Sequence, residues 1–187
     1  LEISQIKNAC DITKKGFKRV LNFVKPNIWE YEIEAEFIHE FIKNKSSGFA
    51  YEPIIASGKN SNVLHYNINN NKCKSGDMIL IDVGAEYGNY SSDMTRTIPV
   101  SGKFSKRQKL VYQSVLNVKS ETEKLLLSGT NIMDLNFNVG EIMTSELVKL
   151  RLLKMDDVKK QNPKKPLYKK YFMHGISHHI GLDTHDY

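Results

Sequence analysis

The sequence predicts an α+β fold, and three observations lead to this expectation. Apolar residues recur at helical spacing in four segments, short β-branched runs bounded by Gly and Asn lie between them, and strands and helices do not alternate regularly. The 187 residues, 40% of them apolar and 26% charged, suit one globular domain that buries a sizeable core. We therefore expect helices grouped around a run of strands.

Two amphipathic helices open the chain. Residues 3–24 carry an apolar stripe that stops before Pro26, a residue that cannot continue a helix. Asn27 and Glu30, three positions apart, resemble a capping box, so a second helix is expected from there until Gly48 ends it.

The remaining elements follow the same kind of signal. Residues 51–57 and 78–82 are short apolar or β-branched runs and predict strands. Residues 105–127 and 131–150 carry helical apolar spacing on either side of a Ser-Gly-Thr turn. From Tyr171 onward the sequence returns to extended character.

The net charge of +6 is concentrated in residues 151–170, where eight basic residues outnumber Asp156 and Asp157. The basic residues are Arg151, Lys154, Lys159, Lys160, Lys164, Lys165, Lys169 and Lys170. The stretch also holds two prolines and no Gly-rich or aromatic-interleaved pattern, so it predicts a solvated loop and no nucleic-acid partner.

No apolar run is long enough to cross a bilayer, and the first residues show no signal-peptide core. We therefore expect a cytoplasmic protein without a membrane partner. Cys10 and Cys73 match no metal or redox spacing, so reduced thiols are expected.

Two aspartates in the segment ILIDVGAEYGNYSSDMTRT carry the first chemical signal. Asp82 and Asp93 flank a turn signal at Tyr87 and Gly88. If these two residues form a two-residue hairpin loop, counting outward along both strands places Asp82 directly opposite Asp93. Directly opposed residues share a face, with Cβ atoms about 4.5 to 5.5 Å apart.

Two carboxylates that close repel each other, and a pair of bridged divalent metal ions would neutralise both. A single Asp more often faces solvent or caps a turn. That reading is weaker here because Ile79, Ile81 and Val83 make the first strand a poor place for an unpaired charge.

Four of the six histidines lie in the segment FMHGISHHIGLDTHDY, namely His174, His178, His179 and His185. The zinc-protease helix requires Glu directly after the first His of an i, i+4 pair, and Gly175 occupies that place, so a bent, extended segment is expected. An ordinary hydrogen-bonded role is expected for His179 and for His39. Metal ligation or proton handling is favoured for the others.

Three motifs in this order, SGKNSNVLHY, ILIDVGAEYGNYSSDMTRT and FMHGISHHIGLDTHD, resemble aminopeptidase P. That family belongs to the pita-bread metallopeptidases, alongside prolidase and methionine aminopeptidase. The opening EISQIKNACDIT is also similar to the first helix of the catalytic domain, so the resemblance covers essentially the whole chain. It implies the pita-bread (creatinase/aminopeptidase-like) fold.

The resemblance also implies residue roles. Asp82 and Asp93 match the aspartate ligands, with Asp93 bridging both metals, and His178 matches the histidine ligand of one metal. The substrate-side histidines, which orient the scissile peptide and stabilise the tetrahedral intermediate, are matched by His65, His174 and His185. Two divalent metal ions are implied, with manganese expected from a carboxylate-rich site holding one imidazole, and cobalt or zinc as alternatives.

The implied reaction removes an N-terminal residue that precedes proline, by attack of a metal-bridging hydroxide. The implied partners are therefore peptides with proline at the second position. A proline amide has no N–H and a constrained ring, so such an enzyme needs a pocket shaped for it.

The family's two remaining ligands are glutamates beyond the HxxxHxxGLDxHD stretch, and this chain ends at Tyr187. We expect residues 1–187 to be a partial catalytic domain, lacking an N-terminal domain and the C-terminal end, and inactive by itself. Prolidase and methionine aminopeptidase of the same fold stay open as alternatives, as does a non-catalytic peptide-binding module. The sequence leaves a homo-oligomer open.

Overall fold

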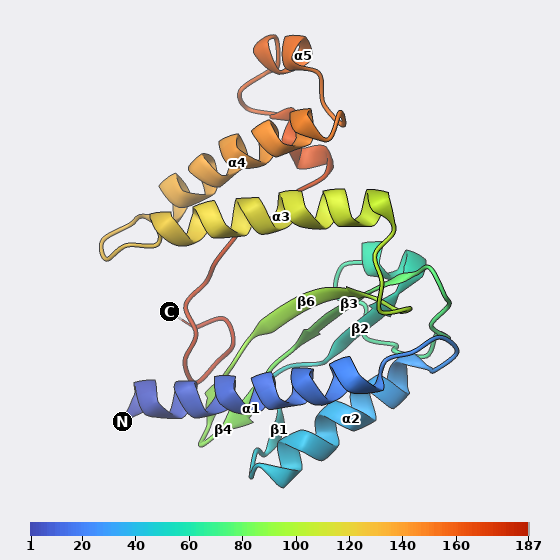
Figure 1. The fold of residues 1–187 in the computed structure, drawn as a ribbon. Coiled ribbons are helices and arrows are strands. Elements are labelled where there is room, and N and C mark those ends of the chain that lie inside the picture. Colours follow the sequence, from blue (N-terminus) through green and yellow to red (C-terminus); the bar gives the residue numbers. More distant parts are fainter. Residues whose placement is uncertain (187) are drawn as a thin grey trace. The chain divides into compact units, whose positions relative to one another are not determined.

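The computed structural model describes residues 1–186, which form two compact units (Figure 1). The first comprises residues 1–103 together with the C-terminal segment from His178, and the second comprises residues 104–177. Within the described residues, the first unit combines helices with two three-stranded antiparallel sheets, and the second is helical. The predicted α+β class is confirmed.

The elements of the first unit are α1 Glu2–Phe23, α2 Glu30–Lys43, β1 Gly48–Phe49, β2 Ile54–Ser57, the 3-10 helix η1 Gly58–Asn62, β3 Met78–Val83, β4 Ala85–Tyr87, β5 Tyr90–Ser91 and β6 Met94–Pro99. Those of the second unit are α3 Lys106–Leu125, α4 Ile132–Lys149, α5 Met155–Lys159 and the 3-10 helix η2 Leu167–Lys170. The four long helices lie where the sequence predicts them.

Helices α1 and α2 pack together and against β3 to form the main core. Its fully buried side chains include Val20, Ile33, Phe37, Phe41, Ile55, Ile79, Ile81 and Val83. The two helices approach closely at Gly16, where an added Cβ would lie 2.7 Å from Cδ1 of Phe37. This close contact requires a residue without a side chain, because an interior packed this densely does not accept an extra methyl group without strain.

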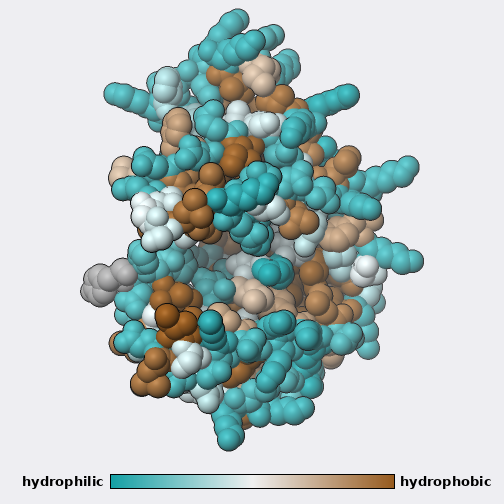
Figure 2. All heavy atoms as spheres, turned by 60° about the vertical axis from the view of Figure 1, so that its left-hand side comes forward, coloured by the Kyte–Doolittle hydropathy of each residue, from teal (hydrophilic) through white to brown (hydrophobic). Residues whose placement is uncertain are grey.

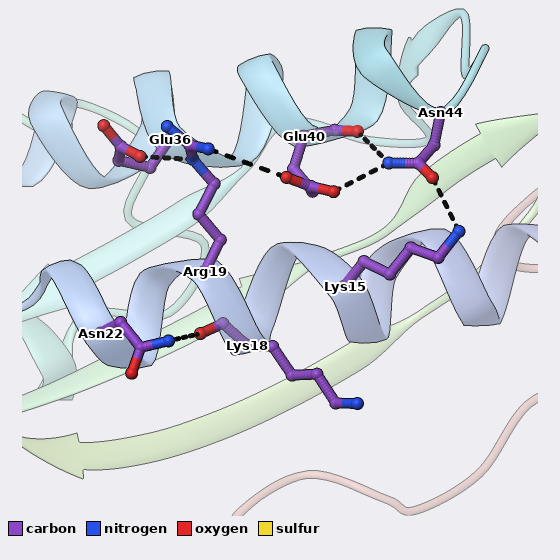
Figure 3. A network of polar contacts seen from close by, with 7 residues as sticks. All are labelled: Lys15, Lys18, Arg19, Asn22, Glu36, Glu40 and Asn44. Atoms are coloured by element: carbon purple, nitrogen blue, oxygen red, sulfur yellow. Dashed lines mark hydrogen bonds and ion pairs between the residues drawn. The ribbon is translucent and has the colours of Figure 1, made fainter.

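A polar network runs along the rim of the same helix pair (Figure 3). It joins Lys15, Arg19, Glu36, Glu40 and Asn44. Asn44 caps the end of α2, because its side-chain amide donates to the carbonyl of Glu40 at 2.8 Å. The helix therefore ends at Lys43, and the expectation that it runs to Gly48 is wrong.

The start of α2 also differs from the expected capping box. Asn27 has a φ of 76° and lies outside the helix, and the residue before the first turn is Trp29. The backbone N–H of Trp29 donates to Oε2 of Glu32 at 2.6 Å. The carboxylate of Glu32 thus takes the place expected for Glu30, whose side chain turns into the protein.

Glu30 is fully buried and accepts five hydrogen bonds, the longest of them from the side-chain amide of Asn60 to Oε1 at 3.5 Å. Its Oε1 accepts from the backbone N–H and the hydroxyl of Ser57, both at 2.7 Å. Its Oε2 accepts from the Tyr66 hydroxyl at 2.7 Å and from the Asn71 N–H at 2.9 Å. Because a buried carboxylate is tolerated only with such partners, Glu30 joins the start of α2 to the end of β2 and to the loop before β3.

The central sheet has the strand order β2-β3-β6. Burial alternates along β3, so that Ile79, Ile81 and Val83 face the core and Asp82 lies on the opposite face. A second sheet, of order β1-β4-β5, continues the same hairpin beyond Gly84.

The hairpin is formed as predicted, but its loop lies one residue further along the chain. The loop residues are Gly88 and Asn89, with φ of 59° and 68°, and Tyr87 pairs with Tyr90. A two-residue turn of this kind requires positive φ at both positions, which Gly and Asn adopt far more readily than Tyr. The predicted Tyr87-Gly88 loop is therefore wrong.

The second unit is built on the antiparallel helices α3 and α4. The Nη1 atom of Arg107, at the start of α3, donates to the carbonyl of Leu150, after the end of α4. Only Val118, Leu135 and Val139 form its buried apolar cluster in the described structure. On the predicted apolar face of α3, Leu110 is 58% and Val115 55% exposed.

The eight basic residues of the 151–170 stretch are all exposed. Figure 2 shows that hydrophilic residues cover much of the face it draws. The exposure agrees with a solvated stretch, but the predicted loop is wrong where α5 and η2 form within it. No helix among residues 1–186 is long and apolar enough to span a membrane.

We expect Glu30→Ala to destabilise the first unit by about 3 to 5 kcal/mol, because it leaves the buried partners of the carboxylate unpaired. Urea unfolding followed by fluorescence of Trp29, the single tryptophan, measures this unit. The matched control is Asp11→Ala, which removes an exposed carboxylate from α1. Equal midpoints for the two variants would contradict the role given to Glu30.

Candidate functional site

The hairpin places Asp82 and Asp93 on one face, but not opposite each other. Asp82 pairs with Thr95 in the ladder between β3 and β6. The β3–β6 ladder ends with Val83 opposite Met94, and the β4–β5 ladder pairs Glu86 with Ser91. Both registers place Asp93 opposite Gly84, which lies two residues after Asp82. The expected direct opposition is wrong, because the loop lies one residue later. The shared face is kept, because a displacement by two residues preserves the side of a strand on which a residue lies.

Between the two acids, the strands approach unusually closely. A Cβ added to Gly84 would lie 1.7 Å from the carbonyl oxygen of Ser92, so only glycine fits. The hydroxyl of Thr13, on α1, accepts from the N–H of Ala85 at 2.8 Å and lies 2.7 Å from the Ser92 hydroxyl. Helix α1 thus fixes the hairpin between the two carboxylates.

Tyr51 joins the two carboxylates. Its hydroxyl lies 2.7 Å from Oδ1 of Asp82 and 3.1 Å from Oδ1 of Asp93. Burial, followed by the charge of Asp82, raises the pKa of Tyr51 far above its ordinary value, so the hydroxyl keeps its proton and donates. Burial also raises the pKa of Asp82; the hydrogen bond from Tyr51 opposes that shift and the charge of Asp93 adds to it. The two carboxylates therefore resist being ionised together, and a bound cation would relieve this.

His178 reaches this face from the far end of the chain. Its Nε2 lies 3.0 Å from Oδ2 of Asp93, and its Nδ1 lies 2.8 Å from the backbone carbonyl of His179. A carbonyl only accepts, so Nδ1 carries a proton, and in the neutral ring Nε2 presents a lone pair to the carboxylate. Two acceptors face each other in that state, and a cation between them would satisfy both.

A tight turn over residues 178–186 fixes the position of His178. The N–H of Ser91, on β5, donates to the Gly181 carbonyl at 2.8 Å. Asp186 closes the turn, because its own N–H donates to the His179 carbonyl and its Oδ2 accepts from the N–H of Leu182, both at 3.1 Å. The predicted bent and extended character of this segment is confirmed by its isolated bridge between residues 179 and 186.

A cavity of about 380 Å³ opens beside the two acids within the first unit. It is lined by Tyr51, Glu52, Ile54, His65, Asn67, Asp82, Asp93, Thr184 and His185. Two of the three expected substrate-side histidines therefore line one cavity with both expected aspartate ligands. The ring of His185 also lies 4.3 Å from that of His178, centroid to centroid.

His174, the third expected substrate-side histidine, belongs to the second unit. Its ring contacts Phe172 at 5.0 Å, and its Nδ1 lies 3.0 Å from the carbonyl of Gly175. Its part in the site stays a prediction.

The donor chemistry of Asp82, Asp93 and His178 fits a divalent cation. Two carboxylates with one imidazole suit such ions, and ligating histidines usually donate their other ring N–H to a carbonyl, as His178 does. Among residues 1–186, no group of three or more His, Cys, Asp or Glu side chains stands around a common centre. The donors are instead linked in a row by hydrogen bonds, with the Tyr51 hydroxyl between the two carboxylates.

The model of metallopeptidase family M24 matches residues 4–187. The chain belongs to this family. It is 40% identical to the Xaa-Pro aminopeptidase of Escherichia coli and 38% identical to that of Haemophilus influenzae, over 99% of its own length. It spans 42% and 43% of the length of these two relatives.

Solved structures give the same result. A substrate complex of Escherichia coli aminopeptidase P matches this M24 chain with a TM-score of 0.91 at 39% identity. Proline aminopeptidase P II from Yersinia pestis matches with a TM-score of 0.89 at 36% identity. Each match covers 99% of this chain and 42% of the solved chain. The pita-bread fold predicted by resemblance is confirmed for the part present.

Sequence reasoning missed five residues that line the cavity: Tyr51, Glu52, Ile54, Asn67 and Thr184. Tyr51 lies in the short connection between β1 and β2 and carries no motif of its own. Its contact with both acids depends on the pairing of β2 with β3, in which Ile54 lies opposite Asp82. The sequence places a strand there, but a strand alone does not state its partner or register.

We expect Tyr51→Phe to weaken binding of divalent metal by about 10- to 100-fold, since it removes the hydroxyl that orients both carboxylates. Titration calorimetry with manganese measures the affinity. Tyr87→Phe is the control, because this half-buried tyrosine lies on the same hairpin outside the cavity lining. Unchanged affinity in Tyr51→Phe would show that the hydroxyl does not organise the acids for metal.

Proposed function

We propose that the protein containing this chain is a metal-dependent aminopeptidase that removes an N-terminal residue preceding proline. The observation that carries the proposal is the meeting of Asp82, Asp93 and His178 on one face beside a cavity lined by His65 and His185. The names of the relatives support it. Because the chain spans less than half of the length of these relatives, its membership in the family does not by itself give the activity, which is therefore a proposal.

The residues of this chain would act in three groups. Asp82, Asp93 and His178 would hold divalent metal ions, with manganese expected. Bound there, the metals would lower the pKa of a water molecule and polarise the scissile carbonyl. Tyr51 would keep the two carboxylates aimed at the ions, as outer hydrogen-bond donors do in such sites.

The histidines would act on the peptide. His65 and His185 line the cavity, and their ring N–H groups would donate to the carbonyl oxygen as negative charge develops there. His65 is held at a φ of 53°, a backbone conformation that costs energy for a residue other than Gly and needs surrounding structure to maintain it. That support comes from Tyr66, the next residue, which is buried against Glu30.

Peptide assays on the full-length protein test the proposal. Xaa-Pro-Yaa peptides, Xaa-Pro dipeptides and Met-Ala peptides separate aminopeptidase P from prolidase and methionine aminopeptidase. We expect the Xaa-Pro-Yaa peptides to be cleaved best. Preference for Met-Ala peptides would overturn the proline specificity.

A non-catalytic peptide-binding module on the same fold is the second candidate. Metal analysis of the full-length protein distinguishes the two, because the module needs no manganese, cobalt or zinc. The cytoplasmic location and a homo-oligomeric state stay predictions.

We expect Asp93→Ala to abolish peptidase activity while leaving the fold intact. The change removes the carboxylate shared by Tyr51 and His178 and relieves the repulsion on Asp82. Activity and unfolding midpoint are measured together, with Asp11→Ala as a control of equal charge change. Retained activity would refute the ligand role of Asp93.

We expect His65→Ala to lower kcat by about 100-fold or more while metal content changes little, because His65 lines the cavity without contacting the acids. Metal content by elemental analysis and kcat are compared in the same preparation. An equal loss of both would make His65 a metal ligand instead.

A further inference from the structure

We propose that Glu52 selects peptides whose N-terminal residue is Lys or Arg, by pairing with that cationic side chain. The inference rests on the proposed function and adds a substrate class to the same cavity. It follows from the charge of the cavity wall and from two polar groups there that the proposed chemistry does not use.

Glu52 is exposed and lines the cavity. Its Oε2 accepts a hydrogen bond from the side-chain amide of Asn67, another lining residue. Within residues 1–186, no Lys, Arg or His forms an ion pair with Glu52, and the cavity lining contains no Lys or Arg. The carboxylate therefore offers one oxygen and a full negative charge to the cavity.

The backbone around Glu52 is held in place on both sides, and its carboxylate accepts the hydrogen bond from Asn67. Tyr51 is hydrogen-bonded to both acids, and Ile54 is paired with Asp82 in the sheet. Asn67 follows Tyr66, which is buried against Glu30. A charge fixed in this way pays little ordering entropy when it meets a ligand, so it discriminates more strongly than a mobile surface glutamate.

Thr184 is the second, independent observation. Its hydroxyl oxygen is buried and has no hydrogen-bond partner among the described residues, and the residue lines the same cavity. A ligand N–H that reached this hydroxyl would recover the free energy that its missing partner costs. An ammonium or guanidinium group supplies such N–H donors together with the charge that complements Glu52.

The α-ammonium of the peptide is also cationic, and every substrate of an aminopeptidase carries it. It lies next to the scissile unit, beside the acids that would hold the metals, whereas a Lys or Arg side chain extends several bonds further. With Asp82 and Asp93 engaged by metal, Glu52 is the remaining carboxylate of the cavity lining. The apolar stem of such a side chain would lie against Ile54, which lines the same wall.

The test compares Lys-Pro-Yaa with norleucine-Pro-Yaa peptides, which differ only in the ammonium group. In the full-length protein we expect kcat/KM to favour the Lys peptide, and Glu52→Gln to lower this preference by about five- to tenfold. Glu52→Gln keeps the shape and the bond from Asn67. Asp183→Asn is the control, because it removes the same charge from an exposed residue outside the cavity lining.

Calorimetric binding of the two peptides to the same variants gives a readout independent of turnover. A Lys preference in binding that Glu52→Gln alone abolishes supports the inference, even if no peptide is cleaved and the proposed function fails. An unchanged preference in Glu52→Gln overturns it. An equal loss on both peptides also overturns it, because the carboxylate would then bind the α-ammonium that both peptides share.

Discussion

The buried carboxylate of Glu30 is the constraint on which the first unit depends. It is fully enclosed and is stabilised by donors from Ser57, Asn60, Tyr66 and Asn71, so the segments that carry them must meet at the start of α2. The end of β2 and the loop before β3 are thereby fixed to one helix. That loop carries His65 and Asn67, and the arrangement of one wall of the cavity follows from a charge that never contacts it.

The opposite wall depends on a close backbone approach. Gly84 lets the two strands of the hairpin come close together at the Ser92 carbonyl. The hydroxyl of Thr13 accepts the hydrogen bond from the buried backbone N–H of Ala85 at this point. The approach gathers two carboxylates on a half-buried face, where burial raises the pKa of Asp82. The resulting excess of negative charge suits a cation-binding site, and Tyr51 limits the repulsion through its hydroxyl.

The cavity is assembled from segments far apart in the chain. Tyr51 and Glu52 precede β2, His65 and Asn67 lie before β3, the acids belong to the hairpin, and Thr184 and His185 come from the C-terminal turn. That turn is attached to β5 through Ser91 and closed by Asp186. Because each segment is fixed by a different interaction, substitutions at the cavity wall can change specificity without loosening the core.

The sequence by itself determined the four long helices and the two central strands β2 and β3, because these follow from local periodicity; the metal-ligand roles that it assigns by side-chain type stay predictions. Ile79, Ile81 and Val83 marked the strand β3 in the sequence, and the structure shows that Asp82 lies on its opposite face. The loop position at Gly88 and Asn89, the inward turn of Glu30 and the contact of Tyr51 with both acids were decided only in the tertiary structure. Each depends on how strands pair or on which donors surround a buried charge, and such relations between distant segments leave no local pattern in the chain.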